Sequence, residues 1–262
     1  MALPLLHIEG LSVGYGSRRI IENLTLPPIS GGSVTALVGP NAAGKTTLLR
    51  GLAGLIPVKG LVRLDNIELT ALTIAGHARH VTYMPQTLPQ RVALTVFEAT
   101  LSALMSSGNA TLSKPEAHER ALRVLERLGI GDLAMRGLDE LSGGQRQLAS
   151  LAQSIVREPT VLLLDEPTSA LDIHHQLRVM QLVEELARER GLIVLIVLHD
   201  IAQATRYSRR IIVLQQGAIA ADGTPEEAVT PDMLARVYQV EARVERCSRG
   251  FVQVMVDRAL DD

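Results

Sequence analysis

The loop that begins at Gly39 has the residue types and spacing that bind phosphate. It reads Gly-Pro-Asn-Ala-Ala-Gly-Lys-Thr and fits the pattern G-x-x-x-x-G-K-S/T. Backbone N–H groups at the start of a helix offer donors and partial positive charge to phosphate oxygens. We expect the Lys45 ammonium to reach the β- and γ-phosphates of a nucleotide and the Thr46 hydroxyl to bind Mg²⁺. The predicted nucleotide-binding residues here are Gly39, Pro40, Asn41, Ala42, Ala43, Gly44, Lys45, Thr46 and Thr47.

An ordinary strand-to-helix turn that happens to contain glycine and lysine is the alternative interpretation of this loop. The chain has only three lysines, at positions 45, 59 and 114. One of them falls at the required place, after a predicted strand over Ser33–Val38 and before a predicted helix over Thr46–Leu55. This context favours phosphate binding.

Two adjacent carboxylates, Asp165 and Glu166, follow the aliphatic run Val161–Leu164. Such a run predicts a buried strand, and ligands of parallel α/β sheets bind at the carboxyl ends of the strands. We expect Asp165 to hold Mg²⁺, through water. Glu166 is expected to point the other way along the strand alternation and to polarise an attacking water. An exposed acidic strand end is the alternative, which the phosphate-type loop makes improbable because a triphosphate and a hard cation need both halves.

A third motif, Ser142-Gly143-Gly144-Gln145, opens a predicted helix. Ser142 is a suitable N-cap, and consecutive glycines leave backbone N–H groups open to an anion. Taken alone, the motif fits a capped surface helix equally well.

The three motifs together resemble, in order and spacing, the ATP-binding-cassette (ABC) ATPases. The resemblance extends from Tyr15 to about Gly223, and its most specific part is the pentapeptide Leu141–Gln145. It implies an α/β fold: a P-loop NTPase core of ABC-ATPase type with an antiparallel β subdomain and an inserted helical subdomain. It also implies that ATP and Mg²⁺ are bound, that ATP is hydrolysed, and that Lys45, Glu166 and His199 are catalytic.

Further roles follow from the same resemblance. Tyr15 would stack on adenine, although a tyrosine on a strand surface is the alternative. Gln86 would contact Mg²⁺, beside Thr46 and Asp165, and sense a membrane partner. The segment Ser169–Asp172 would reach the opposite subunit, and His199 would contact the γ-phosphate.

In this family ATP lies between two copies, so that the phosphate loop of one faces Ser142, Gly143, Gly144 and Gln145 of the other. The resemblance therefore implies a head-to-tail homodimer of closed two-fold symmetry. Alanine at position 42, where the family usually has glycine, is a departure. If that position has a positive φ angle, alanine costs on the order of 1 kcal/mol.

The elements that position these motifs follow an interrupted α/β pattern. Roughly alternating segments, Leu5–Tyr15 and Ile20–Ile29, predict antiparallel strands before the phosphate loop. Val62–Leu69 and Val81–Met84 are further strand candidates, and Ala117–Leu128 predicts an amphipathic helix that includes Leu122. We predict one ABC ATPase domain over residues 1–262, with an α/β core at about 1–86 and 157–262 and a helical subdomain at about 87–156.

Composition excludes several other classes. The formal net charge is −2 and aromatic residues make up 2%, which argues against a nucleic-acid-binding protein. A single cysteine, Cys247, excludes an internal disulfide framework. No aliphatic run approaches the ~20 residues of a membrane-spanning helix, and the N-terminus lacks the pattern of a secretory signal.

Two segments, Ala170–Leu177 and Gly223–Val240, more closely resemble the ATPase subunits of bacterial importers for iron-siderophores, haem and cobalamin. This implies integral membrane permease partners, docked through the surface from Gln86 to Met105. It also implies an indirect partnership with a substrate-binding protein and a peripheral location on the cytoplasmic face of the inner (plasma) membrane. A soluble ABC ATPase that drives an assembly or repair scaffold is the alternative. The pair His174-His175 is expected to lie on a surface helix turn rather than bind metal.

Overall fold

The computed structural model describes residues 2–86, 93–106 and 112–260, and its core is a six-stranded sheet. The strand order is β10-β9-β3-β8-β7-β6, and every neighbouring pair is parallel except the β9–β10 hairpin. Strands β3, β7 and β8 are nearly continuous aliphatic runs because both faces of a parallel sheet are covered. The bounds are β3 (Ser33–Val38), β6 (Val81–Met84), β7 (Val161–Asp165), β8 (Ile193–Val197), β9 (Arg210–Gln215) and β10 (Ala218–Gly223).

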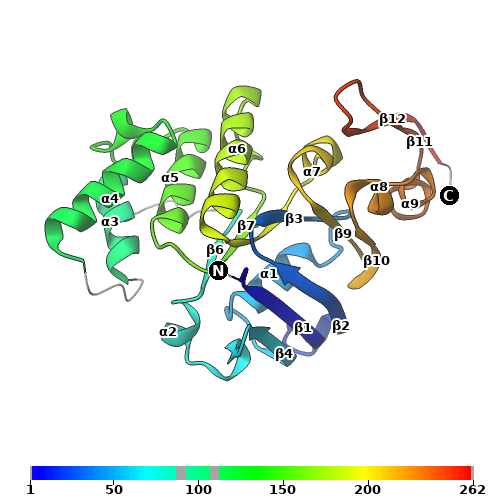
Figure 1. The fold of residues 1–262 in the computed structure, drawn as a ribbon, viewed down its shortest axis with the longest axis horizontal. Coiled ribbons are helices and arrows are strands. Elements are labelled where there is room, and N and C mark those ends of the chain that lie inside the picture. The colour runs from blue at the N-terminus through cyan, green and yellow to red at the C-terminus, as the bar shows by residue number, and fades with distance from the viewer. Residues whose placement is uncertain (1, 87–92, 107–111, 261–262) are drawn as a thin grey trace.

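A second, antiparallel sheet lies beside this core (Figure 1). Its order is β2-β1-β4-β5, and its strands are β1 (Leu5–Tyr15), β2 (Arg18–Ser30), β4 (Val58–Leu64) and β5 (Ile67–Glu68). Its buried side chains share one hydrophobic cluster with helix α1 (Lys45–Leu52) and with one face of the main sheet, where Leu163 and Leu195 lie. The phosphate-type loop therefore connects a strand and a helix that are both packed in the core.

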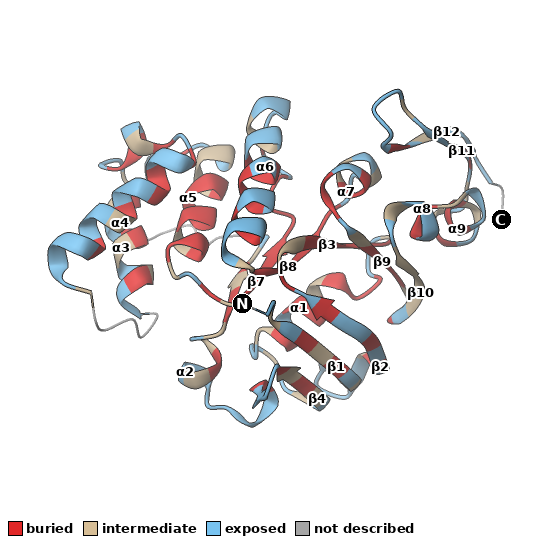
Figure 2. Cartoon of the chain, viewed as in Figure 1, coloured by how far each residue is buried: buried red, intermediate tan, exposed pale blue. Residues whose placement is uncertain are grey.

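The opposite face of the main sheet packs against helices. Leu162 and Leu164 of β7 belong to a cluster with buried residues of α5 (Gly143–Ile155), α6 (Ile173–Arg190) and α7 (Ile201–Tyr207). Helices α3 (Val96–Ser106), α4 (Lys114–Arg127) and α5 lie together at one end of the molecule (Figure 1), and their buried residues continue the same cluster. Figure 2 shows buried stripes on these helices and exposed residues facing outward.

The remaining elements are short helices and a C-terminal hairpin. These are α2 (Ile74–His77), α8 (Pro225–Ala228), α9 (Pro231–Tyr238), β11 (Val240–Arg246) and β12 (Val252–Ala259), with 3-10 turns at Leu69–Ala71, Gly131–Leu133 and Leu138–Glu140. Among the described residues, we find no helix that is both long and apolar enough to cross a bilayer.

The structure corrects two sequence expectations. The predicted strand over Val62–Leu69 is interrupted, because Asp65 adopts φ 50° in a tight turn that folds β5 back onto β4. Leu122 is 43% exposed and lies off the buried stripe of α4, which is formed by Ala117, Ala121, Val124 and Leu125. The predicted docking surface from Gln86 to Met105 and the predicted helical subdomain both include residues outside the described ranges.

Candidate active site

The loop from Gly39 to Gly44 joins β3 to α1 at the carboxyl edge of the main sheet. Three of its residues have φ angles in the left-handed region: Gly39 at 147°, Ala42 at 61° and Gly44 at 105°. A side chain at Gly39 would collide with the backbone carbonyl of Leu214 on the neighbouring strand β9. The close approach of β9 and the sharp turn therefore both require the first glycine.

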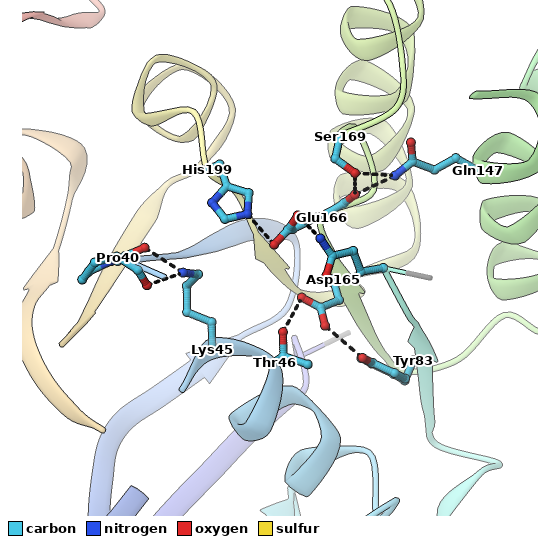
Figure 3. A network of polar contacts seen from close by, with 11 residues as sticks. Pro40, Lys45, Thr46, Tyr83, Gln147, Asp165, Glu166, Ser169 and His199 are labelled. Carbon is cyan, nitrogen blue, oxygen red and sulfur yellow. Dashed lines mark hydrogen bonds and ion pairs between the residues drawn. The ribbon is translucent and has the colours of Figure 1, made fainter. Parts of the chain in front are cut away.

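Lys45 is the first residue of α1, yet its side chain folds back over the loop. It is only 6% exposed, and its Nζ donates hydrogen bonds to the carbonyl oxygens of Gly39 at 2.7 Å and Pro40 at 2.8 Å. Burial lowers the pKa of the Lys45 ammonium, while the nearby carboxylates of Glu166 and Asp165 partly offset this effect. The loop thus holds a partly desolvated cation where phosphate oxygens would arrive (Figure 3).

The lowered pKa of Lys45 predicts that ATP affinity depends on pH. In the free protein the ammonium loses its proton below the ordinary value of 10.5, whereas bound phosphates stabilise the protonated form. Binding therefore takes up a proton above the lowered pKa, and the affinity should fall as the pH rises through that pKa towards 10.5. Titration calorimetry in buffers of different ionisation enthalpy measures this uptake. The variant Lys45→Gln should bind more weakly without that uptake; an equal uptake in both proteins would contradict the assignment.

Ala42 meets the condition under which an alanine at this position is strained. Its φ of 61° lies in the left-handed region, where a Cβ costs about 1–2 kcal/mol and glycine is at ease. Because glycine also loses more entropy on folding, we expect Ala42→Gly to raise the free energy of unfolding by a net ~0.5–1 kcal/mol. Urea unfolding without nucleotide measures it. Ala43, which is buried and does not have a left-handed φ angle, is the matched control, and Ala43→Gly should lower the free energy of unfolding. A lower free energy of unfolding in Ala42→Gly would contradict the presence of strain at Ala42.

Asp165 ends strand β7 as a fully buried carboxylate. Its Oδ1 accepts a hydrogen bond from the Thr46 hydroxyl at 3.2 Å, and its Oδ2 accepts one from the Tyr83 hydroxyl at 2.9 Å. The predicted metal residues Thr46 and Asp165 therefore lie side by side, although they are 119 residues apart in the chain. A carboxylate and a hydroxyl are oxygen donors of the kind that Mg²⁺ prefers, so the donor set fits that ion.

Tyr83 on β6 is a residue that the sequence analysis did not predict. Burial raises its pKa to about 12, so the hydroxyl stays protonated and donates to Asp165 at neutral pH. The signal that could have identified Tyr83 is the parallel pairing of β6 with β7. This pairing places Tyr83 opposite Leu163, and Leu163 is two residues before Asp165.

Glu166 leaves the strand rather than continuing its alternation. The strand ends at Asp165, and Glu166 takes φ 52°, so a left-handed backbone turn sets the direction of its side chain. Its carboxylate is largely buried, with Oε1 paired to His199 Nε2 and Oε2 accepting from Gln86 Nε2 at 2.6 Å. Parallel pairing of Asp165 with Val197 brings Glu166 and His199 to the same edge (Figure 3). The structure thus joins Glu166, His199 and Gln86 in one contact group.

Ser142 caps helix α5 as expected. Its hydroxyl accepts from the backbone N–H of Gln145 at 3.3 Å, and the Gln145 side chain accepts from the Ser142 N–H at 3.1 Å. Ser142, Gly143, Gly144 and Gln145 line a surface cavity of about 520 Å³ together with Ala170, Leu171, Asp172 and His175. Among the hydrogen bonds of the described residues, none joins this turn to the phosphate loop, so one copy does not bring the two motifs into contact.

Tyr15 lies at the end of β1 and is 44% exposed. Its hydroxyl accepts from the Arg50 guanidinium at 3.2 Å, which leaves much of the ring open to solvent. His174 and His175 lie in the first turn of α6, where His175 pairs with Asp172. The part of the chain that is described contains no group of three or more side chains placed to hold a metal ion by histidine, cysteine and carboxylates alone.

Gln147 is a second residue that the sequence analysis missed. It lies two positions beyond Gln145 in α5, is 5% exposed, and its Nε2 donates to the backbone carbonyl of Glu166 at 2.6 Å. A polar residue on the buried face of a helix was the signal. Gln147 therefore ties the helix that begins at Ser142 to the turn that carries Glu166 (Figure 3).

A family model described as "ABC transporter" matches residues 23–169. Among curated proteins, the ferric enterobactin transport ATP-binding protein FepC of Escherichia coli is 38% identical over 243 residues, covering 90% of this chain and 88% of FepC. The hemin import ATP-binding protein HmuV of Rhodopseudomonas palustris is 35% identical over 271 residues, covering 96% of this chain and 98% of its own.

Solved structures agree in fold. A metal-chelate type ABC transporter in an inward-facing conformation superposes with a TM-score of 0.80 at 25% identity, covering 97% of this chain and 98% of that chain. A dimeric ATP-binding cassette in a post-hydrolysis state, bound to ADP and Pi, gives a TM-score of 0.77 at 27% identity. The match covers 84% of this chain and 98% of that chain.

Proposed function

Because the chain belongs to the ABC transporter family and is an ATPase of its cassette type, we propose that it energises a bacterial importer of iron-siderophore, haem or similar chelated cargo such as cobalamin. The observation that carries this proposal is similarity over nearly the full length of the siderophore and hemin import ATPases, beyond the nucleotide site. Likeness to one chain of a metal-chelate type ABC transporter supports the same cargo class. The alternative, a soluble ABC ATPase acting on an assembly or repair scaffold, is not favoured.

In the proposed site each of the predicted nucleotide-binding and catalytic side chains has its own task. Lys45, with the loop N–H groups, holds the β- and γ-phosphates of ATP. Glu166 accepts a proton from the attacking water, and His199 orients Glu166 and reaches the γ-phosphate. Tyr15 stacks on adenine. These residues bind, orient and move a proton, and the chemistry needs no covalent intermediate.

Mg²⁺ is the metal that we assign to Thr46, Asp165 and Gln86. The buried carboxylate of Asp165 is oriented by Thr46 and Tyr83, and the Gln86 amide lies next to Glu166. When bound, the ion would neutralise charge on the β- and γ-phosphates. The residues at hand supply oxygen donors that suit a hard cation.

Two copies are proposed to complete the site in a head-to-tail dimer. Ser142, Gly143, Gly144 and Gln145 line an open surface cavity and do not contact the phosphate loop of their own chain in the hydrogen bonds of the described residues. In a two-fold pair they would face the nucleotide held by the other copy. Dimeric cassettes among the structural neighbours support this arrangement.

We further propose that the dimer docks peripherally, at the cytoplasmic face of the plasma membrane, on integral permease subunits through residues from Gln86 to Met105. A substrate-binding protein would be an indirect partner. Within the single domain, residues 87–156 would be the helical subdomain that carries this surface, and residues 1–86 and 157–262 the core. Gln86 suits a linking role because its side chain contacts Glu166 directly.

Affinity purification tests this assignment. Tagged Glu166→Gln protein is captured from source-cell membranes with ATP present, and bound proteins are identified by mass spectrometry. We expect a permease with many membrane-spanning helices, and an exposed-residue variant such as Lys114→Ala in the same background should recover it equally. Recovery of soluble scaffold proteins without a permease would contradict the importer assignment while leaving the ATPase activity standing.

A further inference from the structure

The segment Pro167–Leu171, here called the 167–171 loop, follows Glu166 and is held by glutamine side chains from three helices. Gln147 of α5 donates to Ser169 Oγ at 3.3 Å and accepts from the Ala170 N–H at 3.0 Å. Gln176 of α6 donates to the backbone carbonyls of Thr168 at 3.2 Å and Leu171 at 3.0 Å. The loop is therefore fixed on both sides by side chains rather than by regular secondary structure.

Gln203 of α7 closes a ring of hydrogen bonds on one side of this loop. Its Nε2 donates to Gln176 Oε1 at 2.7 Å, and its Oε1 accepts from the Thr168 hydroxyl at 3.4 Å. Because Gln176 donates in turn to the Thr168 carbonyl, three residues from three segments form a closed circuit. We call Thr168, Gln176 and Gln203 the glutamine ring.

The hydrogen-bond polarity of the glutamine ring is fixed. The carbonyls of Thr168 and Leu171 can only accept, so the Gln176 amide must present its NH₂ group to the loop. Its oxygen then faces Gln203, which must donate, and the Gln203 oxygen is left for the Thr168 hydroxyl. A side chain at position 203 that is as large as glutamine but cannot donate a hydrogen bond would therefore break the ring.

The glutamine ring lies close to the contact between Glu166 and His199. Helix α7 begins two residues after His199, and Asp200 caps it by accepting from the Ala202 N–H at 2.8 Å. Glu166, His199 and the three ring residues all line one cavity of about 310 Å³. Besides the hydrogen bond from the Glu166 N–H to the Val197 carbonyl, the segments carrying His199 and Glu166 are joined by the contact between these two side chains and by the ring.

We propose that Gln176 and Gln203 are positioning residues for ATP hydrolysis: through the ring they hold α7 and the 167–171 loop at the spacing that keeps His199 against Glu166. This rests on the proposed function of those two side chains. The ring contacts no residue of the phosphate loop in the described hydrogen bonds, so it acts on the hydrolytic step rather than on ATP binding.

The pH profile of Gln203→Glu tests this role. An ionised carboxylate at position 203 cannot donate to Gln176 Oε1, whereas the protonated acid can, so the neighbouring acceptor and the half-buried position should raise its pKa above the usual ~4.3. We expect kcat to be about tenfold below wild type at pH 8 and the deficit to shrink as the pH falls towards the raised pKa, with an unchanged KM for ATP. Steady-state Mg-ATP hydrolysis of both proteins across this range gives the ratio.

Gln181→Glu is the matched control, because Gln181 is an exposed residue of the same helix as Gln176 and gains the same charge outside the ring. Its kcat should follow wild type at every pH. A Gln203→Glu enzyme that also follows wild type, or one with a pH-independent loss or a change confined to KM, would overturn the proposal. Failure of the wild-type protein to hydrolyse ATP would instead contradict the proposed function.

A second pair of variants keeps the test open if Gln203→Glu does not fold. Thr168 is 6% exposed, and Thr168→Ser keeps the hydroxyl that donates to Gln203, whereas Thr168→Val is close in size and removes it. We expect the serine variant to keep kcat within about twofold and the valine variant to lose about three- to tenfold, at equal KM. Equal kcat values in the two variants would contradict the proposed role of the glutamine ring in hydrolysis.

Discussion

Replacing Glu166 with glutamine should lower kcat for Mg-ATP hydrolysis by about 10²–10⁴-fold while ATP still binds. Glutamine has the same shape and can keep a hydrogen bond to His199, but it cannot accept the proton of the attacking water. The buried position of Glu166, between His199 and Gln86, means that no other carboxylate replaces it without rearrangement, since Asp165 is already paired to Thr46 and Tyr83.

Phosphate release under saturating ATP measures the loss, and fluorescent-nucleotide titration measures the binding. Glu184→Gln, an exposed carboxylate of α6, removes the same charge away from the site and should leave both quantities unchanged. Retention of more than about a tenth of the wild-type kcat in Glu166→Gln would rule out Glu166 as the principal base.

Lys45→Ala should lower ATP affinity by about 100-fold or more, equivalent to ~2.8 kcal/mol or more of binding free energy. Two effects add. The substitution removes the cation opposite the phosphates, and it leaves the carbonyl oxygens of Gly39 and Pro40 without their donor.

Isothermal titration with ATP in the presence of Mg²⁺ measures this change. Lys114→Ala, at an exposed position, should bind as wild type does. Because Lys45 contributes two hydrogen bonds to its own loop, a thermal unfolding curve for the apo variant separates loss of binding from loss of fold. Unaltered affinity in a folded Lys45→Ala protein would show that the phosphates bind elsewhere.

The parts that could be predicted from sequence are those in which neighbouring residues decide the outcome. The phosphate loop lies between a mostly apolar strand and a helix, and Ser142 and Gln145 form a local capping box, so both follow from short patterns. The aliphatic strand β7 was equally clear, and its parallel pairing with β8 brings Glu166 and His199 to one edge.

The parts that could not be predicted depend on contacts distant in sequence or on unusual backbone. No residue type signals that a glutamate will adopt φ 52°; the turn at Glu166 is held by Val197 and Gln147 from elsewhere in the chain. Tyr83 acquires a role only when β6 lies beside β7. The C-terminal hairpin was missed because it buries little beyond Ala242 and Val252 and otherwise presents charged pairs to solvent.

The central claim is that two copies share each ATP site, and mixing two inactive variants tests it most directly. Glu166→Gln removes the proposed base from the half of the site that carries the phosphate loop. Gly143→Asp places a carboxylate in the other half, at the turn expected to face the phosphates. A side chain at Gly143 meets no atom closer than 3.9 Å, and an acidic residue suits the first turn of a helix, so the second variant should fold.

In a mixed dimer one of the two sites would contain both intact halves. We expect the equimolar mixture to regain Mg-ATP hydrolysis, to about one quarter of the wild-type rate if pairing is random and the two sites act independently. A mixture that stays as inactive as its components, although mixed dimers are detected by native mass spectrometry, would contradict a shared site.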